Sequence, residues 1–235
     1  MPKKFEKEFI SYCEIQNLEV NPNQIKVIKK LEDYHNSNYK SFFSKVFSKQ
    51  KIKKGFYLYG GVGVGKTMIL NFFYDHLEEK KLKKHFNEFM LGFHDFVHEQ
   101  KEKNEENVIN QFVKNLKSKA SLVYFDEFQV TNIVDAMILG KLFEQIFKED
   151  IKIILTSNTK ISELYKEGLQ REQFIPFIKI MEDQSIEYEL KIEDDYRKSN
   201  DNQKQRYFFP LNQETNFKIN KLSLIHISEP TRRYN

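Results

Sequence analysis

The stretch Gly60–Thr67 reads GGVGVGKT, and it decides the fold. It matches the pattern G-x-x-x-x-G-K-[ST], in which a glycine-rich loop surrounds the phosphates of ATP or GTP with backbone N–H groups. Glycine lets the backbone turn these groups inward, and Lys66 adds a positive charge. Thr67 can offer its hydroxyl oxygen to Mg²⁺. We therefore expect this chain to bind a nucleotide.

The sequence on either side places the loop between a strand and a helix. Phe56–Gly60, FYLYG, is typical of a short buried strand, and Met68–Leu77 has apolar residues at helical spacing. The N-terminal end of this helix would face the phosphates with its positive dipole. The predicted nucleotide-contacting residues are Gly60, Gly61, Val62, Gly63, Val64, Gly65, Lys66, Thr67 and Met68.

Two acidic residues follow a second apolar run. Leu122–Phe125 is continuous in the manner of a parallel strand buried on both faces, and Asp126 and Glu127 come directly after it. Open α/β sheets bind ligands at this carboxyl end. We expect Asp126, with Thr67, to hold Mg²⁺, and Glu127 to orient or deprotonate the attacking water.

A third strand with a polar end is Ile151–Asn158, IKIILTSN. If it lies beside the Ser121 strand, Asn158 would stand between Glu127 and the γ-phosphate and could hold the water in line. The alternative is an asparagine that only completes a turn.

The first arginine of this lysine-rich chain is Arg171. Lysine cannot reproduce the planar guanidinium group, so an arginine kept here suggests a specific use. We expect Arg171 to act in trans, as an arginine finger on the γ-phosphate of a neighbouring subunit in a homo-oligomer. The alternative is an ordinary surface ion pair.

Together these segments predict a three-layer α/β domain of the P-loop NTPase class, AAA-like, with a five-stranded parallel sheet. The strands are expected in the segments that begin at Gly55, His85, Ser121, Ile151 and Ser185. The expected regions are a helical N-terminal extension and linker (1–54), the ATPase core (55–191) and the beginning of a C-terminal region (192–221). Lys80–Lys84 is predicted to be a charged turn.

Helix caps are predicted at two places. Asn21-Pro22-Asn23-Gln24 is typical of a helix start, with Asn21 as the cap and Gln24 closing a capping box. Asn132 and Asp135 are expected to cap the helix that continues to Phe147.

One histidine pair imitates a zinc motif. His94 and His98 have the spacing of H-E-x-x-H, but Asp95 replaces the glutamate and a third ligand is not evident. We interpret the pair as histidines on a helix face.

Composition excludes several classes of protein. The chain has 235 residues, a net charge of +4, one cysteine (Cys13) and no apolar run that approaches a membrane span. Lysine and glutamate are mixed along the chain, which indicates a solvated surface more than a nucleic-acid interface. We expect a cytoplasmic protein that does not bind nucleic acid.

Residues 222–235 are predicted to derive from a sequencing adapter and not from the natural gene. Leu222–Arg232, LSLIHISEPTR, equals the in-frame translation of a transposase adapter used to prepare sequencing libraries. Residues 222–235 are therefore predicted to be non-native, and the natural protein to continue beyond Lys221.

The chain resembles the ZapE cell-division family of AAA-type ATPases, relatives of the yeast protein called ATPase family gene 1. The matching motifs are YLYGGVGVGKTMIL (57–70), HFNEFML (85–91), FDEFQVTNIVDAMIL (125–139), TSN (156–158), LYKEGLQREQFIPFI (164–178) and DYR (195–197). Val64, Asn87 and Asn132 depart from the family pattern without removing a catalytic group.

The resemblance implies ATP hydrolysis with Mg²⁺, coupled to remodelling of a protein client. It points to FtsZ at the division ring and to a peripheral, membrane-proximal position. Two alternatives are a nucleotide-dependent binding module, such as a DNA replication loader, and a P-loop small-molecule kinase. The loader would need a basic surface interleaved with aromatic residues, and the kinase an acceptor pocket and a lid.

Overall fold

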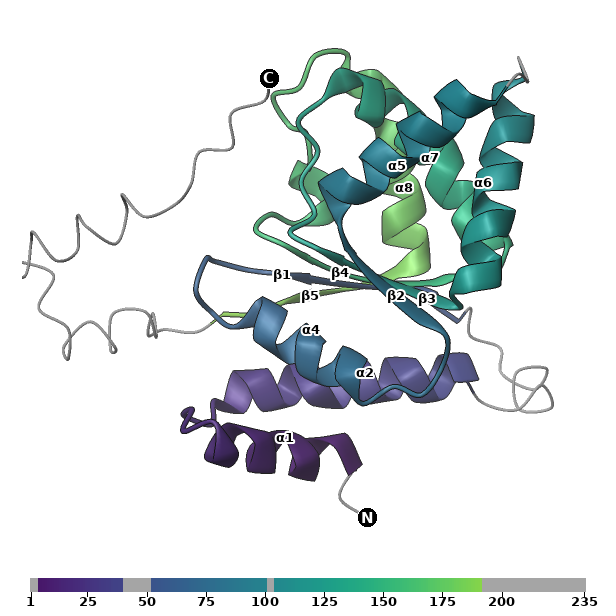
Figure 1. Cartoon of the computed structure of the whole chain (residues 1–235). Coiled ribbons are helices and arrows are strands. Elements are labelled where there is room, and N and C mark those ends of the chain that lie inside the picture. The colour runs from purple at the N-terminus through teal and green to yellow at the C-terminus, as the bar shows by residue number, and fades with distance from the viewer. Residues whose placement is uncertain (1–3, 40–51, 101–103, 192–235) are drawn as a thin grey trace, which may run out of the picture. The chain divides into compact units, whose positions relative to one another are not determined.

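A parallel sheet of five strands lies at the centre of the fold, with helices on both faces (Figure 1). The computed structural model of the chain describes residues 4–39, 52–100 and 104–191. The strands are β1 (Gly55–Tyr59), β2 (Lys81–His85), β3 (Leu122–Asp126), β4 (Lys152–Ser157) and β5 (Ser185–Glu189). The helices are α1 (Lys4–Ile15), α2 (Pro22–Tyr39), α4 (Lys66–Asp75), α5 (Phe86–Glu99), α6 (Glu105–Lys119), α7 (Ile133–Lys148) and α8 (Ile175–Gln184), with the short 3₁₀ helices η1 (Ile161–Glu163) and η2 (Arg171–Gln173). The predicted three-layer α/β fold with a five-stranded parallel sheet is confirmed.

The order of the strands brings distant parts of the chain to one edge. The sheet runs β2-β3-β4-β1-β5, and every pairing is parallel. The last residue of β1, Tyr59, lies opposite Ser157 at the end of β4, and β3 pairs with the other side of β4. The loops that leave β1, β3 and β4 therefore meet at the carboxyl edge, where open α/β sheets bind their ligands.

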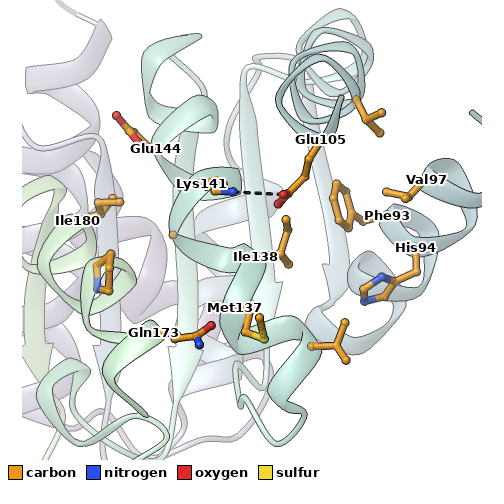
Figure 2. Close-up of a pocket in the computed structure, with 14 residues that line it drawn as sticks. Phe93, His94, Val97, Glu105, Met137, Ile138, Lys141, Glu144, Gln173 and Ile180 are labelled. Atoms are coloured by element: carbon orange, nitrogen blue, oxygen red, sulfur yellow. Dashed lines mark hydrogen bonds and ion pairs between the residues drawn. The ribbon is translucent and has the colours of Figure 1, made fainter. Parts of the chain in front are cut away.

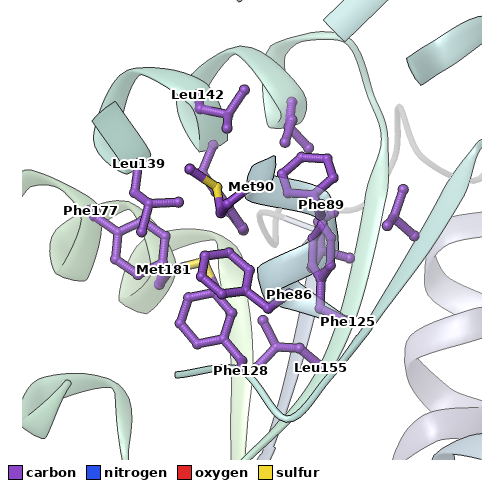
Figure 3. Close-up of a cluster of buried hydrophobic side chains, with 14 of the residues drawn as sticks. Phe86, Phe89, Met90, Phe125, Phe128, Leu139, Leu142, Leu155, Phe177 and Met181 are labelled. Carbon is purple, nitrogen blue, oxygen red and sulfur yellow. The ribbon is translucent and has the colours of Figure 1, made fainter. Parts of the chain in front are cut away.

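Each face of the sheet is buried under its own set of helices. Figure 1 shows α5, α6, α7 and α8 on one face, and α4, α2 and α1 on the other. Successive side chains of a strand point to opposite faces, so Val123 and Phe125 of β3 join the first cluster while Leu122 and Tyr124 join the second. Figure 3 shows the first cluster, in which phenylalanines from α5, β3 and α8 pack together. This packing fixes the strands that carry the site.

The prediction of a charged turn at Lys80–Lys84 is wrong, because Lys81–His85 forms β2. β2 is an edge strand, and lysines are tolerated there because they protect the open edge from pairing with another chain. Lys81 Nζ donates to Tyr74 O in the last turn of α4 at 2.5 Å and to Leu77 O just after the helix at 2.6 Å. Lys83 Nζ donates to Asn71 Oδ1 at 2.6 Å. The lysines of this strand thus hold β2 to the helix beside it.

Asn21 caps the N-terminus of α2, as predicted. Asn21 Oδ1 accepts from Asn23 N at 2.8 Å, as expected of a cap. Asn23 Nδ2 donates to Lys191 O at 2.9 Å, which ties this end of α2 to the residues after β5.

None of the helices in the described ranges combines the length and apolarity needed to cross a bilayer.

Candidate nucleotide-binding site

The glycine-rich loop follows β1 directly and enters α4. Gly60, Gly63 and Gly65 have φ angles of 154°, 88° and 90°, a region that residues with a Cβ seldom adopt. Gly65 is also the N-cap of α4, so the backbone turns into the helix at this residue. A Cβ on Gly60 would lie 2.4 Å from Leu190 O. The predicted loop therefore needs glycine for its conformation and, at Gly60, for space.

The Lys66 side chain connects the loop to the end of β4. It is 8% exposed, and its Nζ donates to Gly60 O at 2.9 Å and to Gly61 O at 2.6 Å. The same ammonium group donates to Asn158 Oδ1 at 3.0 Å. Because β3 and β4 are neighbours, as the prediction for Asn158 required, this asparagine lies at the phosphate-binding loop.

A second group of polar side chains surrounds the Asp126 carboxylate at the end of β3. Asp126 is 5% exposed, and its Oδ1 accepts from Thr67 Oγ1 at 3.1 Å and from Thr156 Oγ1 at 2.7 Å. The backbone N–H of Glu127 lies 3.2 Å from the same oxygen. The structure thus joins the predicted residues Thr67 and Asp126. These hydroxyl and N–H donors hold the carboxylate in one orientation at the end of β3.

Glu127 occupies a strained position. Its φ is 54°, in the left-handed region that a non-glycine residue adopts at a cost of about 1–3 kcal/mol, and its side chain is exposed. Hydrogen bonds with β4 hold this turn: Glu127 N donates to Thr156 Oγ1 at 3.0 Å, and Phe128 N donates to Thr156 O at 2.7 Å. Thr156 is therefore a site residue that the sequence reasoning missed. Its place in a TSN tip beside Asn158 was the available signal.

Gln24 is a second missed residue, and its predicted role in a capping box is not the one observed. Its side chain is 3% exposed, and Nε2 donates to Val64 O in the phosphate-binding loop at 3.1 Å. A Cβ on Gly65 would lie 2.7 Å from the same nitrogen. The side chain thus packs against the loop from outside. No local sequence pattern could indicate a contact between residues that are 40 positions apart.

Arg171 begins η2, where Nη2 donates to Ser162 O at 2.8 Å. Among the described residues its hydrogen bond goes to this carbonyl and not to the phosphate-binding loop, and its Nε is buried without a partner. Within the described residues, Arg171 does not form a hydrogen bond with Lys66 or with Asp126. Its predicted use in trans stays a prediction.

The histidine pair and the second predicted cap lie on the other face of the sheet. His94 Nε2 is 2.7 Å from Asp135 Oδ1, while Asn132 alone caps α7 by accepting from Val134 N at 2.8 Å. Asp135 therefore binds a histidine on α5 instead of sharing the cap. Across the part of the chain that the structure describes, histidine, cysteine and acidic side chains do not gather in threes to hold a metal.

A separate apolar pocket of about 910 Å³ lies between α5, α6, α7 and α8 (Figure 2). Its lining includes Phe93, Val97, Met137 and Ile138, and the ion pair between Lys141 and Glu105 crosses it. None of the predicted site residues lines this pocket. It belongs to a different part of the surface from the carboxyl edge of the sheet.

The residues at the carboxyl edge fit a magnesium ion. Mg²⁺ in phosphate-binding sites takes one or two protein oxygens and completes its shell with phosphates and water. Thr67 Oγ1 and the Asp126 carboxylate are oxygen donors 3.1 Å apart. The donor set suits a hard cation bound together with a triphosphate.

The chain is similar in sequence and in fold to several known proteins. Lactation elevated protein 1 homolog B of Danio rerio is 39% identical over 161 residues, 64% of this chain and 32% of the relative. Cell division protein ZapE of Escherichia coli strain K12 is 35% identical over 172 residues, 73% of this chain and 45% of the relative. The chain thus spans less than half the length of these relatives. The crystal structure of the DnaC helicase loader superposes with a TM-score of 0.50 at 15% identity, covering 73% of this chain and 92% of that one, which shows the fold alone.

The family assignment comes from the sequence as a whole. The family model described as AFG1-like ATPase matches residues 12–233. The matched range includes part of the segment 222–235, whose adapter origin stays a prediction. Because the match covers most of the chain and ZapE is among the similar proteins, the predicted resemblance is confirmed. The chain belongs to the AFG1-like ATPase family.

Proposed function

We propose that this chain binds ATP with Mg²⁺ and hydrolyses it, with cleavage of the γ-phosphate. One observation carries the proposal: Lys66 reaches Asn158 and Thr67 reaches Asp126, so three segments far apart in the sequence converge at one edge of the sheet. A structural ion-pair network would not require a glycine loop with three positive φ angles beside it.

Each residue has a role in this proposal. Lys66, with the loop N–H groups, binds the phosphates, while Thr67 and Asp126 hold Mg²⁺. The metal, when bound, supplies positive charge to the β- and γ-phosphates. Glu127 is exposed and close to this edge, so its carboxylate orients or deprotonates the attacking water. Asn158 holds that water in line.

The substitution Glu127→Gln tests the chemical step. It removes the base and preserves the size of the side chain, so we expect ATP affinity within about twofold of wild type and turnover lower by roughly a hundredfold or more. Glu149→Gln is the matched control. Glu149 ends α7 just before β4 begins, at the amino-terminal ends of the strands and away from the site, so this variant should retain activity. Normal turnover in Glu127→Gln would remove Glu127 from this role. Phosphate release without an added acceptor separates a hydrolase from a kinase.

We also propose that hydrolysis drives remodelling of a protein client by a cytoplasmic homo-oligomer close to the membrane. The name of the relative ZapE, a cell division protein, supports a client in the division machinery, and FtsZ is the first to test. Co-sedimentation of the chain with FtsZ polymers, with and without ATP, measures whether the chain binds FtsZ and whether ATP is required. ATP-dependent binding supports the client. Binding to single-stranded DNA instead would favour a replication loader.

A further inference from the structure

A polar residue occupies a core-facing position of α2. It is the first member of a buried stripe on one face of the helix, spaced i, i+3, i+4 and i+7: Gln24, Val27, Ile28 and Leu31. Burying an amide costs free energy unless a hydrogen bond compensates for the loss of water, so an apolar residue would be the ordinary occupant of this position. The reason for a glutamine lies in its contact with the phosphate-binding loop.

The Gln24 amide holds one peptide group of that loop. Its Nε2 donates to Val64 O at 3.1 Å, and a Cβ on Gly65 would lie 2.7 Å from the same nitrogen. A peptide group is planar and trans, so its C=O and its N–H point in opposite directions. Because the Val64 carbonyl points to Gln24 on α2, the N–H of Gly65 points away from this helix. The N–H groups of successive residues in loops of this kind are the donors that bind phosphate.

The start of α2 is itself anchored to the sheet. Asn23 Nδ2 donates to Lys191 O at 2.9 Å. The residue before Lys191, Leu190, donates its N–H to Tyr59 O at 2.8 Å, where β1 ends. The phosphate-binding loop begins directly after this strand. The side chain of Gln24 therefore reaches the loop from a support that is joined to the strand carrying the loop.

We propose that Gln24 is a positioning residue for the phosphate-binding loop: by holding the Val64 carbonyl, it keeps the Gly65 N–H directed at the triphosphate. This inference rests on the proposed function. It makes α2, which precedes the ATPase core in the sequence, a part of nucleotide binding. A side chain of equal size that cannot donate leaves this peptide group free to turn. The loop must then be ordered when the nucleotide binds, at a cost in affinity.

Two substitutions on the same helix form a matched pair for the test. Gln24→Met keeps the length of the side chain and removes the donor. Asn38→Leu does the same to a second buried amide of α2, whose Nδ2 donates to Tyr34 O at 3.0 Å and to Lys53 O at 2.9 Å. The two positions are about 20 Å apart along the helix axis. Two quantities are measured on the full chain: the affinity for a non-hydrolysable ATP analogue, with Mg²⁺ and with EDTA, and turnover at saturating ATP.

The proposal predicts a loss of affinity in one variant only. Gln24→Met should bind the analogue about three- to tenfold more weakly, the scale of one hydrogen bond. The loss should be equal with Mg²⁺ and with EDTA, because the loop and not the metal is affected. Turnover at saturating ATP should stay within about twofold of wild type, and Asn38→Leu should keep the wild-type affinity. Gln24→Asn, whose amide is too short to reach Val64 O, should repeat the loss and replaces the methionine variant if that variant does not fold.

Wild-type affinity in Gln24→Met overturns the inference, as does an equal loss in Asn38→Leu, which would indicate a general loosening of the fold. A loss seen only with Mg²⁺ would place the effect at the metal and overturn the inference as well. If wild type bound the analogue but released no phosphate from ATP, the proposed function would be contradicted, and the affinities would still decide the role of Gln24. Absence of analogue binding in wild type would contradict both.

Discussion

Two constraints require glycine at position 60: the backbone φ angle and the lack of room for a Cβ. The φ of Gly60 is 154°, and an added Cβ would lie 2.4 Å from Leu190 O, a backbone atom that cannot move away easily. We expect Gly60→Ala to lower the free energy of unfolding by about 1–3 kcal/mol and to weaken nucleotide binding. Urea unfolding and ATP titration measure the two effects.

Gly92→Ala is the control for this substitution. Gly92 lies within α5, and a Cβ there would meet nothing within 4 Å. Alanine should stabilise the helix by up to about 1 kcal/mol and leave nucleotide binding unchanged. If both alanine variants behaved alike, the account of Gly60 would be wrong.

Residue type and spacing were enough to predict most of the site. Lys66, Thr67 and Asp126 were identified because the chemistry of phosphate and Mg²⁺ requires those side chains, and the structure brings them together. Gln24 and Thr156 were not, since their contacts join segments that only the folded chain brings close. The left-handed backbone at Glu127 was likewise invisible, because it arises from hydrogen bonds with β4.

The sequence predicted the central strands of the sheet better than the edge strand β2. β1, β3 and β4 were predicted because each is a short apolar run, buried on both faces in the structure. The strand expected to begin at His85 was placed too late, because β2 ends at that residue; an edge strand needs few apolar residues, and the lysines of Lys81–His85 resembled a turn. Apolar content identifies central strands, whereas an edge strand depends on its neighbours.

The turn between α7 and β4 gives a prediction at the scale of an element. Asp150 Oδ2 lies 2.7 Å from Lys152 Nζ, and its Oδ1 lies 3.2 Å from Lys54 Nζ. Burial alone would raise the pKa of Asp150, but the lysines, Lys152 first, outweigh it and hold that pKa below its ordinary value. The charged pair therefore contributes stability above the pKa of the unfolded chain and loses it as the pH falls through the lower, folded value.

Asp150→Asn isolates this charge. Asparagine accepts the φ of 56° found at this position, so the turn should persist. Because Asp150 is half exposed, we expect the free energy of unfolding at pH 7 to fall by no more than about 1 kcal/mol. The difference from wild type should shrink below about pH 4, where Asp150 becomes protonated in the unfolded chain. Urea unfolding from pH 7 to pH 3 measures it, and a difference independent of pH would contradict the assignment.

At the scale of the whole molecule, the open question is how copies of the chain cooperate. Arg171 bonds to Ser162 in its own chain, and the trans arrangement requires its guanidinium to reach a neighbour. If it does, Arg171→Lys should lower turnover by about 10³-fold or more, the scale known for an arginine finger. Mixing this variant with wild type should lower activity more than in proportion to the fraction added. Strictly proportional activity would exclude the trans geometry.

The account as a whole depends on the loop and the acidic strand end binding one magnesium triphosphate. Calorimetric titration of ATP into wild type, Lys66→Ala and Asp126→Asn, each with Mg²⁺ and with EDTA, tests this most directly. We predict that Lys66→Ala weakens binding in both conditions, whereas Asp126→Asn loses only the gain that Mg²⁺ provides. ATP affinity absent from wild type, or a full Mg²⁺ gain retained in Asp126→Asn, would contradict the account.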